Sequence, residues 1–134
     1  ATERGLVTAM NELIGLQYGW GHKPGDGSGM TDCFQLSCAA RRHLGLRDHS
    51  DMYAWVYEQY DEATFTVQRL VRFLLTSGTR TSDPEPGDML LMPGGKRALG
   101  TVTGHGTLYI GGGHQVVHLP AVTLQAHYFR MDKA

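Results

Sequence analysis

Two separated stretches of the sequence carry the residue types that a cysteine nucleophile requires. Cys33 follows a glycine-rich stretch and an aspartate, and it opens a segment of helical periodicity, which predicts a thiol in the first turn of a helix. Much further along the chain, His105 begins a predicted strand. The positive end of a helix dipole stabilises a thiolate, and a histidine within reach can accept the thiol proton. Together these two groups predict nucleophilic catalysis by cysteine.

The same residue types also have structural interpretations. A cysteine on the apolar face of a helix is more often part of the core than a nucleophile. Cys38, on the same predicted helix, is expected to be a small buried hydrophobe. His105, His114 and His118 could together bind a metal, but no carboxylate at a suitable spacing joins them, so no metal site is predicted. No cofactor is expected.

Composition limits the classes of function. The 134 residues are 41% hydrophobic and 19% charged, with a formal net charge of −1, which predicts a single globular domain over residues 1–134. No basic stripe is present, so nucleic acid is not an expected partner. No apolar run is long enough to span a bilayer. No charged-then-apolar leader opens the sequence, which leaves a cytoplasmic, virion-associated or machine-delivered protein as the expectation.

The elements that must position Cys33 are helices and loops. Apolar residues at helical spacing predict an amphipathic helix over residues 3–16, followed by a glycine-rich loop over 18–29. Asp32 is the predicted N-cap of the next helix, with Gln35 three positions later as in a capping box. That helix is expected to end near Gly45. A further helical region over 51–75 is expected to break near residues 61–64.

The second half of the chain predicts strands. A turn over 83–88 leads into a short apolar strand over 89–92, and a loop then extends to about residue 102. Strands over 105–110 and 115–119 are joined by three glycines, which is a hairpin signal. Short strands near 122–125 and 127–131 are expected to complete a meander. Helices followed by strands predict an α+β fold, with the N-terminal helices packed on a C-terminal antiparallel sheet.

Five short segments stand in the order of one family's motifs: Tyr18-Gly19-Trp20-Gly21, Asp32-Cys33-Phe34-Gln35-Leu36, Pro86-Gly87-Asp88-Met89, His105-Gly106-Thr107-Leu108-Tyr109-Ile110-Gly111 and Val117-His118-Leu119. They resemble, in turn, Tyr-x-Trp-Gly-Gly, Asp-Cys-Ser-Gly-Leu, Pro-Gly-Asp-Leu, His-Val-Gly-Ile-Tyr-Ile-Gly and Ile-His-Ala of the NlpC-type peptidases. That family consists of bacterial cell-wall cysteine peptidases with a papain-like core. Each motif alone is weak, and the specificity lies in their common order.

The resemblance implies a catalytic set. Cys33 is the expected nucleophile, His105 the base, and His118 the third member that orients the base. His114 shares the predicted strand face of His118 and is the alternative third member. The backbone N–H of Cys33 is an orphan donor in a first helical turn and is expected to help bind the oxyanion.

The resemblance also implies residues that contact the substrate. Tyr18 is expected to line the site and to add a second oxyanion donor, with Trp20 beside it in the same loop. Asp32 matches the family aspartate that holds the free amine of the substrate. An ordinary N-cap and ordinary loop aromatics are the structural alternatives for these residues. Phe34 and Gln35 replace the small Ser-Gly pair of the family and place bulkier groups near the site.

The implied reaction is hydrolysis of an amide in a peptidoglycan stem peptide, at the γ-D-glutamyl to diamino acid bond, through a thioester acyl-enzyme. The alternatives are a thiol acyltransferase or protease that acts on another amide, and a non-catalytic phage-tail assembly domain. The helical insert over 51–75 is closer to phage-tail members and secreted toxin amidases than to compact exported members. A delivery machine or a tail protein is therefore an expected partner.

Overall fold

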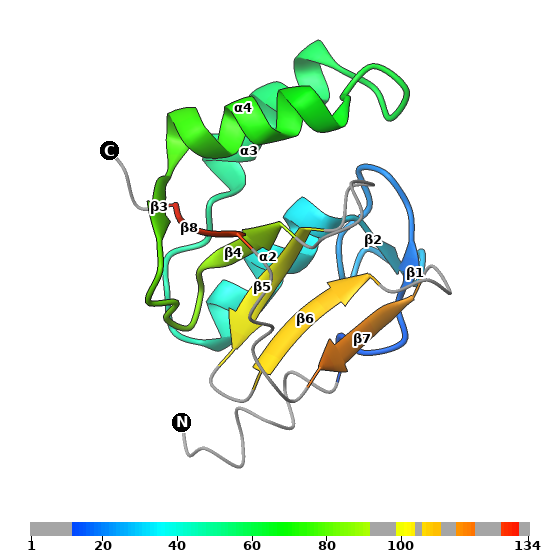
Figure 1. Ribbon diagram of the computed structural model, residues 1–134. Coiled ribbons are helices and arrows are strands. Elements are labelled where there is room, and N and C mark those ends of the chain that lie inside the picture. Colours follow the sequence, from blue (N-terminus) through cyan, green and yellow to red (C-terminus); the bar gives the residue numbers. More distant parts are fainter. Residues whose placement is uncertain (1–11, 92–98, 104–105, 111–114, 120–126, 132–134) are drawn as a thin grey trace.

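The computed structural model describes residues 12–91, 99–103, 106–110, 115–119 and 127–131 (Figure 1). Within these ranges the chain is α+β, as predicted. The helices are α2 (Cys33–His43), α3 (Ser50–Gln59) and α4 (Val67–Ser77). The strands are β1 (Gln17–Tyr18), β2 (Met30–Thr31), β3 (Thr79–Thr81), β4 (Met89–Leu91), β5 (Leu99–Thr103), β6 (Gly106–Ile110), β7 (Val116–Leu119) and β8 (His127–Arg130). None of the described helices is long and apolar enough to cross a membrane.

The main sheet has six strands in the order β3-β8-β4-β5-β6-β7, and every neighbouring pair is antiparallel. Strands β4 to β7 form a meander, in which β4, β6 and β7 are predicted strands and β5 is an additional one. The prediction that the last strand would extend this meander is wrong, because β8 lies between β3 and β4. Phe129 pairs with Met89 there and is buried in the core, so burial favours this distant pairing. The strand predicted near 122–125 lies outside the described residues.

A central strand was expected to be a loop. Residues 99–103 form β5, and all five are buried. Burial on both faces removes the polar–apolar alternation by which an exposed strand is recognised. Gly100 reflects the tight packing, because a Cβ at that position would lie 3.1 Å from the carbonyl oxygen of Leu108. The apolar pattern of the sequence therefore did not predict the most completely buried strand.

Helix α2 packs across one face of the sheet. Its residues Leu36, Ala39 and Ala40 form a buried cluster with Leu108 of β6 and Val116 of β7. The alternating side chains of the strands explain this contact, because the register places Leu108 and Val116 on the same face. This packing holds α2, and with it Cys33, against the sheet.

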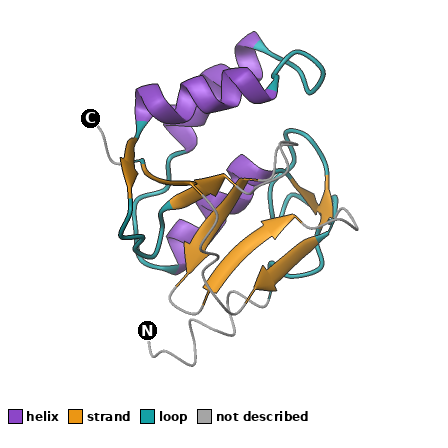
Figure 2. Cartoon of the chain, viewed as in Figure 1, coloured by secondary structure: helices purple, strands orange, loops and turns teal. Residues whose placement is uncertain are grey.

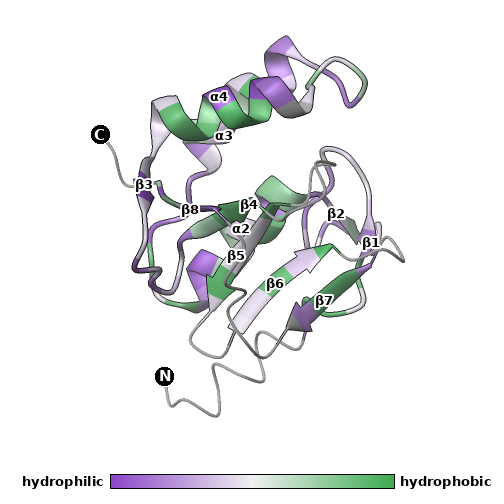
Figure 3. Cartoon of the chain, in the orientation of Figure 1, coloured by the Kyte–Doolittle hydropathy of each residue, from purple (hydrophilic) through white to green (hydrophobic). Residues whose placement is uncertain are grey.

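The predicted break in the second helical region is confirmed. Asp61 and Thr64 close the turn between α3 and α4 by mutual bonds, since each backbone N–H donates to the side-chain oxygen of the other at 2.9 Å. Thr66 then caps α4 by accepting the N–H of Arg69. Helix α4 leads into β3 (Figure 2), and its hydrophobic and hydrophilic residues alternate along the helix in Figure 3. The apolar residues Leu70 and Phe73 are buried.

Only the end of the predicted opening helix is described. Residues 12–15 form a turn and residue 16 lies outside any helix, so the prediction of a helix up to residue 16 is wrong at this end. Gly15 has a φ of +92°, which a right-handed helix excludes, and its N–H donates to the carbonyl of Val116 at 2.9 Å. The chain is thereby tied to β7 instead of continuing a helix. Residues 1–11 lie outside the described part.

Candidate functional site

Cys33 is the first residue of α2, as the sequence predicted. Asp32 has an extended backbone, and its Oδ1 accepts the N–H of Gln35 at 2.9 Å, so it is the N-cap of this helix. The reciprocal half of a capping box is replaced, because the Asp32 N–H donates to the carbonyl of His22. Cys33 is 8% exposed. Its thiol therefore lies in a first helical turn, mostly covered by the protein.

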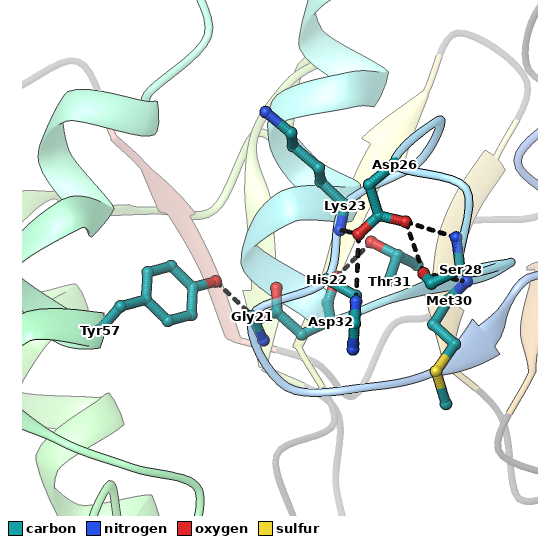
Figure 4. A network of polar contacts seen from close by, with 9 residues as sticks. All are labelled: Gly21, His22, Lys23, Asp26, Ser28, Met30, Thr31, Asp32 and Tyr57. Carbon is teal, nitrogen blue, oxygen red and sulfur yellow. Dashed lines mark hydrogen bonds and ion pairs between the residues drawn. The ribbon is translucent and has the colours of Figure 1, made fainter.

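The glycine-rich loop folds over this helix end (Figure 4). Strands β1 and β2 pair in parallel, with Tyr18 opposite Thr31. Gly21, with a φ of +77°, donates its N–H to Asp32 Oδ2 at 2.8 Å. Asp26 organises the outer part of the loop by accepting the N–H groups of Lys23 and Ser28. These bonds fix a glycine-rich segment that has no periodic structure of its own.

Four of the predicted site residues belong to this junction. Tyr18 is half-buried in β1 and lies beside the segment that leads to Asp32 and Cys33. Trp20 is half-buried and packs edge-on against Tyr57, with ring centroids 5.3 Å apart. The structure thus brings together Tyr18, Trp20, Asp32 and Cys33. Whether Tyr18 donates to an oxyanion stays a prediction.

Asp32 is the electrostatic centre of the junction. It is fully buried, and its Oδ2 accepts the Tyr57 hydroxyl at 2.6 Å as well as the N–H of Gly21. Burial raises the pKa of Asp32 above its usual 3.8, although the bonds from Gln35, Tyr57 and Gly21 oppose the rise. The N-cap reading is confirmed. The proposed contact with a substrate amine stays a prediction at this point.

The raised pKa of Asp32 predicts a pH-dependent stability. Below pH 3.8 this carboxyl is protonated in both the folded and the unfolded chain. As the pH rises through the raised pKa, the folded chain holds the proton longer, so this group removes stability. We expect the free energy of unfolding of wild type minus that of Asp32→Asn to decrease across this window. Urea titrations at a series of pH values measure this difference in the free energy of unfolding. A difference that does not change with pH would refute the raised pKa of Asp32.

Of the three histidines predicted to belong to the site, the structure describes one, His118. His118 lies on β7 opposite Leu108, on the sheet face that packs against α2, and its Nε2 is 3.3 Å from the Thr103 hydroxyl oxygen. His105 and His114 lie outside the described residues. The pairing of Cys33 with His105 and the choice of third member therefore stay predictions. Among the described residues, no three His, Cys, Asp or Glu side chains form a group that could hold a metal ion.

The C-terminal end of β5 is linked by hydrogen bonds to the last turn of α2. Thr103 pairs with Gly106 where β5 and β6 are connected. Val102, next to Thr103, accepts the N–H of Gly87, and the Gly87 carbonyl accepts a bond from Arg41 in the last turn of α2. The 11 residues of α2 span about 16 Å at 1.5 Å per residue. Hydrogen bonds through Gly87 thus link the residue next to Thr103 to the last turn of α2, about one helix length from Cys33.

Comparison with protein-family models, with curated proteins and with solved structures finds no match to this chain. The function of this chain is therefore inferred from its own residues and from the order of its motifs.

Tyr57 is a site residue that sequence reasoning missed. It belongs to α3, within the helical insert, and reaches Asp32 across 25 positions of sequence. A tyrosine on a helix of mixed polarity carries no local mark of such a contact. The spacing of four residues between Tyr53 and Tyr57 indicates only that both lie on the same face of a helix.

The second cysteine is a structural residue. Cys38 is fully buried, neither Cys33 nor Cys38 forms a disulfide, and burial raises the pKa of Cys38 to about 11. We expect iodoacetamide at pH 8 to leave Cys38 unmodified in the folded protein and to modify it after unfolding in urea, because the thiolate is the reactive form. Peptide mapping by mass spectrometry measures both states. Rapid modification of Cys38 in the folded protein would show that this part of the core opens readily.

Proposed function

We propose that the protein is a cysteine amidase that hydrolyses an amide of peptidoglycan stem peptides, at the γ-D-glutamyl to diamino acid bond. The observation that carries this proposal is the position of Cys33, which is the first residue of a helix capped by Asp32. Tyr18 and Trp20 gather at the same junction. The order of the five motifs along the chain supports the assignment to NlpC-type chemistry.

The proposed reaction has two steps. The Cys33 sulfur attacks the scissile carbonyl, and His105 accepts the thiol proton and passes it to the leaving amine. The C–N bond breaks and a thioester forms. Water, deprotonated by the same imidazole, then attacks the thioester and releases the acid and the free thiol. The Cys33 backbone N–H and Tyr18 are the proposed donors to the oxyanion, and His118, or alternatively His114, orients the base.

A non-catalytic assembly domain is the second candidate, and two observations favour it. The strand end that precedes the predicted base is linked through Gly87 to Arg41 in the last turn of α2, whereas Cys33 begins that helix. Cys33 is also only 8% exposed. A packed thiol would alkylate slowly at all pH values below its ordinary pKa, whereas an activated thiol reacts rapidly below neutral pH.

Digestion of purified peptidoglycan and its stem peptides, with products identified by mass spectrometry, tests the proposal. Cleavage at one amide would establish the enzyme and identify its bond. An added amine acceptor distinguishes hydrolysis from acyl transfer, because a transferase would form the amide of the acceptor. Absence of cleavage, together with slow alkylation of Cys33 at pH 6, would contradict the proposal and favour the assembly domain.

A further inference from the structure

We propose that the Tyr57 hydroxyl occupies the carboxylate of Asp32, so that a substrate amine cannot bind there. The site then prefers substrates whose amino terminus is acylated over substrates whose amino terminus is free. This inference rests on the proposed function, because it assumes that substrate binds beside Cys33. It assigns a specificity-determining role to a residue of the helical insert. The resemblance alone predicts the opposite preference, in which Asp32 binds a free amine.

The acceptor capacity of Asp32 is already used within the protein. A carboxylate offers about four lone-pair sites. Oδ1 accepts the N–H of Gln35, and Oδ2 accepts both the N–H of Gly21 and the hydroxyl of Tyr57. The backbone N–H of Phe34 also favours the charged form of this carboxylate and lowers its pKa. With the side chain fully buried, an ammonium group could bind Asp32 only by displacing one of these donors.

Of these donors, Tyr57 alone is a side chain, and its hydroxyl points toward Asp32 (Figure 4). Packing holds the ring in place. Its ring packs edge-on against Trp20 at 5.3 Å and against Phe34 at 6.4 Å between centroids. Burial and the neighbouring Asp32 raise the pKa of Tyr57 well above its usual value, so the hydroxyl remains a protonated donor at physiological pH. The aromatic contacts restrict rotation of the ring away from Asp32.

The consequence for recognition follows from the cost of an unpaired charge. A substrate ammonium beside this junction would lose water without gaining a carboxylate partner, which is unfavourable. A neutral N-acyl group makes no such demand. The favoured substrates are therefore stem peptides still joined through their amino terminus to a longer chain or a sugar, as opposed to peptides already trimmed to a free amine.

Two matched substrates test this preference. Both are L-Ala-γ-D-Glu-diamino acid peptides, one with a free amino terminus and one acetylated. For the wild type we expect kcat/KM for the acetylated peptide to exceed that for the free peptide by about tenfold, the range in which an unpaired buried polar group discriminates. A ratio of one or below would overturn the inference while leaving the amidase proposal intact.

A pair of variants assigns the preference to Tyr57. Tyr57→Phe removes the hydroxyl that occupies Asp32 Oδ2 and keeps the ring, so we expect the ratio to fall severalfold toward one. Tyr60→Phe removes a hydroxyl from the same aromatic cluster without touching the contacts of Asp32, and we expect it to keep the wild-type ratio. An unchanged ratio in Tyr57→Phe would refute the role of Tyr57. If this variant fails to fold, the wild-type ratio still decides the preference.

Affinity labelling separates this inference from the proposed hydrolysis. Chloromethyl ketones of L-Ala-γ-D-Glu, acetylated or free, would alkylate Cys33 with release of chloride, and intact mass measures the rate without any turnover. Faster labelling by the acetylated probe, with no peptide hydrolysed, would support the inference and contradict the amidase proposal. Equal labelling by both probes, or faster labelling by the free one, would overturn the inference whatever the enzyme hydrolyses.

Discussion

Replacing Cys33 by alanine is expected to lower kcat/KM for stem-peptide hydrolysis by at least about 10³-fold, because no other group can form the thioester. The rate of release of the diamino acid product, followed by mass spectrometry, measures this loss. Cys33 lies at the start of α2, and alanine keeps both the helix and its Asp32 cap. The melting temperature should therefore change little, so that lost activity reports chemistry and not unfolding.

Cys38→Ala is the matched control, since Cys38 is a fully buried residue of the same helix. Well below the melting temperature it should keep the wild-type kcat/KM. The melting temperature itself should fall, because the variant leaves a small cavity. His105→Ala should reduce activity nearly as much as Cys33→Ala. Activity retained in Cys33→Ala would exclude the covalent mechanism altogether.

Local signals explain why the start of α2, with Cys33 in its first turn, could be predicted. A glycine-rich loop, a capping aspartate and an apolar period lie within one short stretch, and the cap bond joins residues three positions apart. The break between α3 and α4 was predictable for the same reason, because Asp61 and Thr64 bond each other. Features specified within one turn of chain can be inferred from sequence alone.

Long-range contacts explain what could not be predicted. The insertion of β8 between β3 and β4 depends on pairing with residues 36 to 51 positions earlier, which no local pattern encodes. β5 is buried on both faces and so has no alternation. The contact of Tyr57 with Asp32 is equally non-local. At the site itself, sequence therefore located the thiol and its cap but missed the side chain that occupies the capping carboxylate.

Phe34 connects α2 to the insert, at the position where NlpC-type motifs have a small serine. It is 1% exposed, and its ring lies within 6.4 Å, between centroids, of four aromatic rings. These rings belong to Tyr53, Tyr57, Phe65 and Phe73. The bulk of this side chain is therefore explained by the insert, which supplies the aromatic residues that surround it.

Phe34→Ala is accordingly expected to lower the free energy of unfolding by about 3–5 kcal/mol, the usual cost of removing a buried phenyl ring. The lost transfer free energy and the cavity both contribute, and so do the edge-to-face ring contacts. Urea denaturation followed by circular dichroism measures the loss. Phe34→Leu retains much of the volume and should lose clearly less. If Phe34→Ala lost under about 1 kcal/mol, the insert would have to be held against α2 by contacts other than this aromatic cluster.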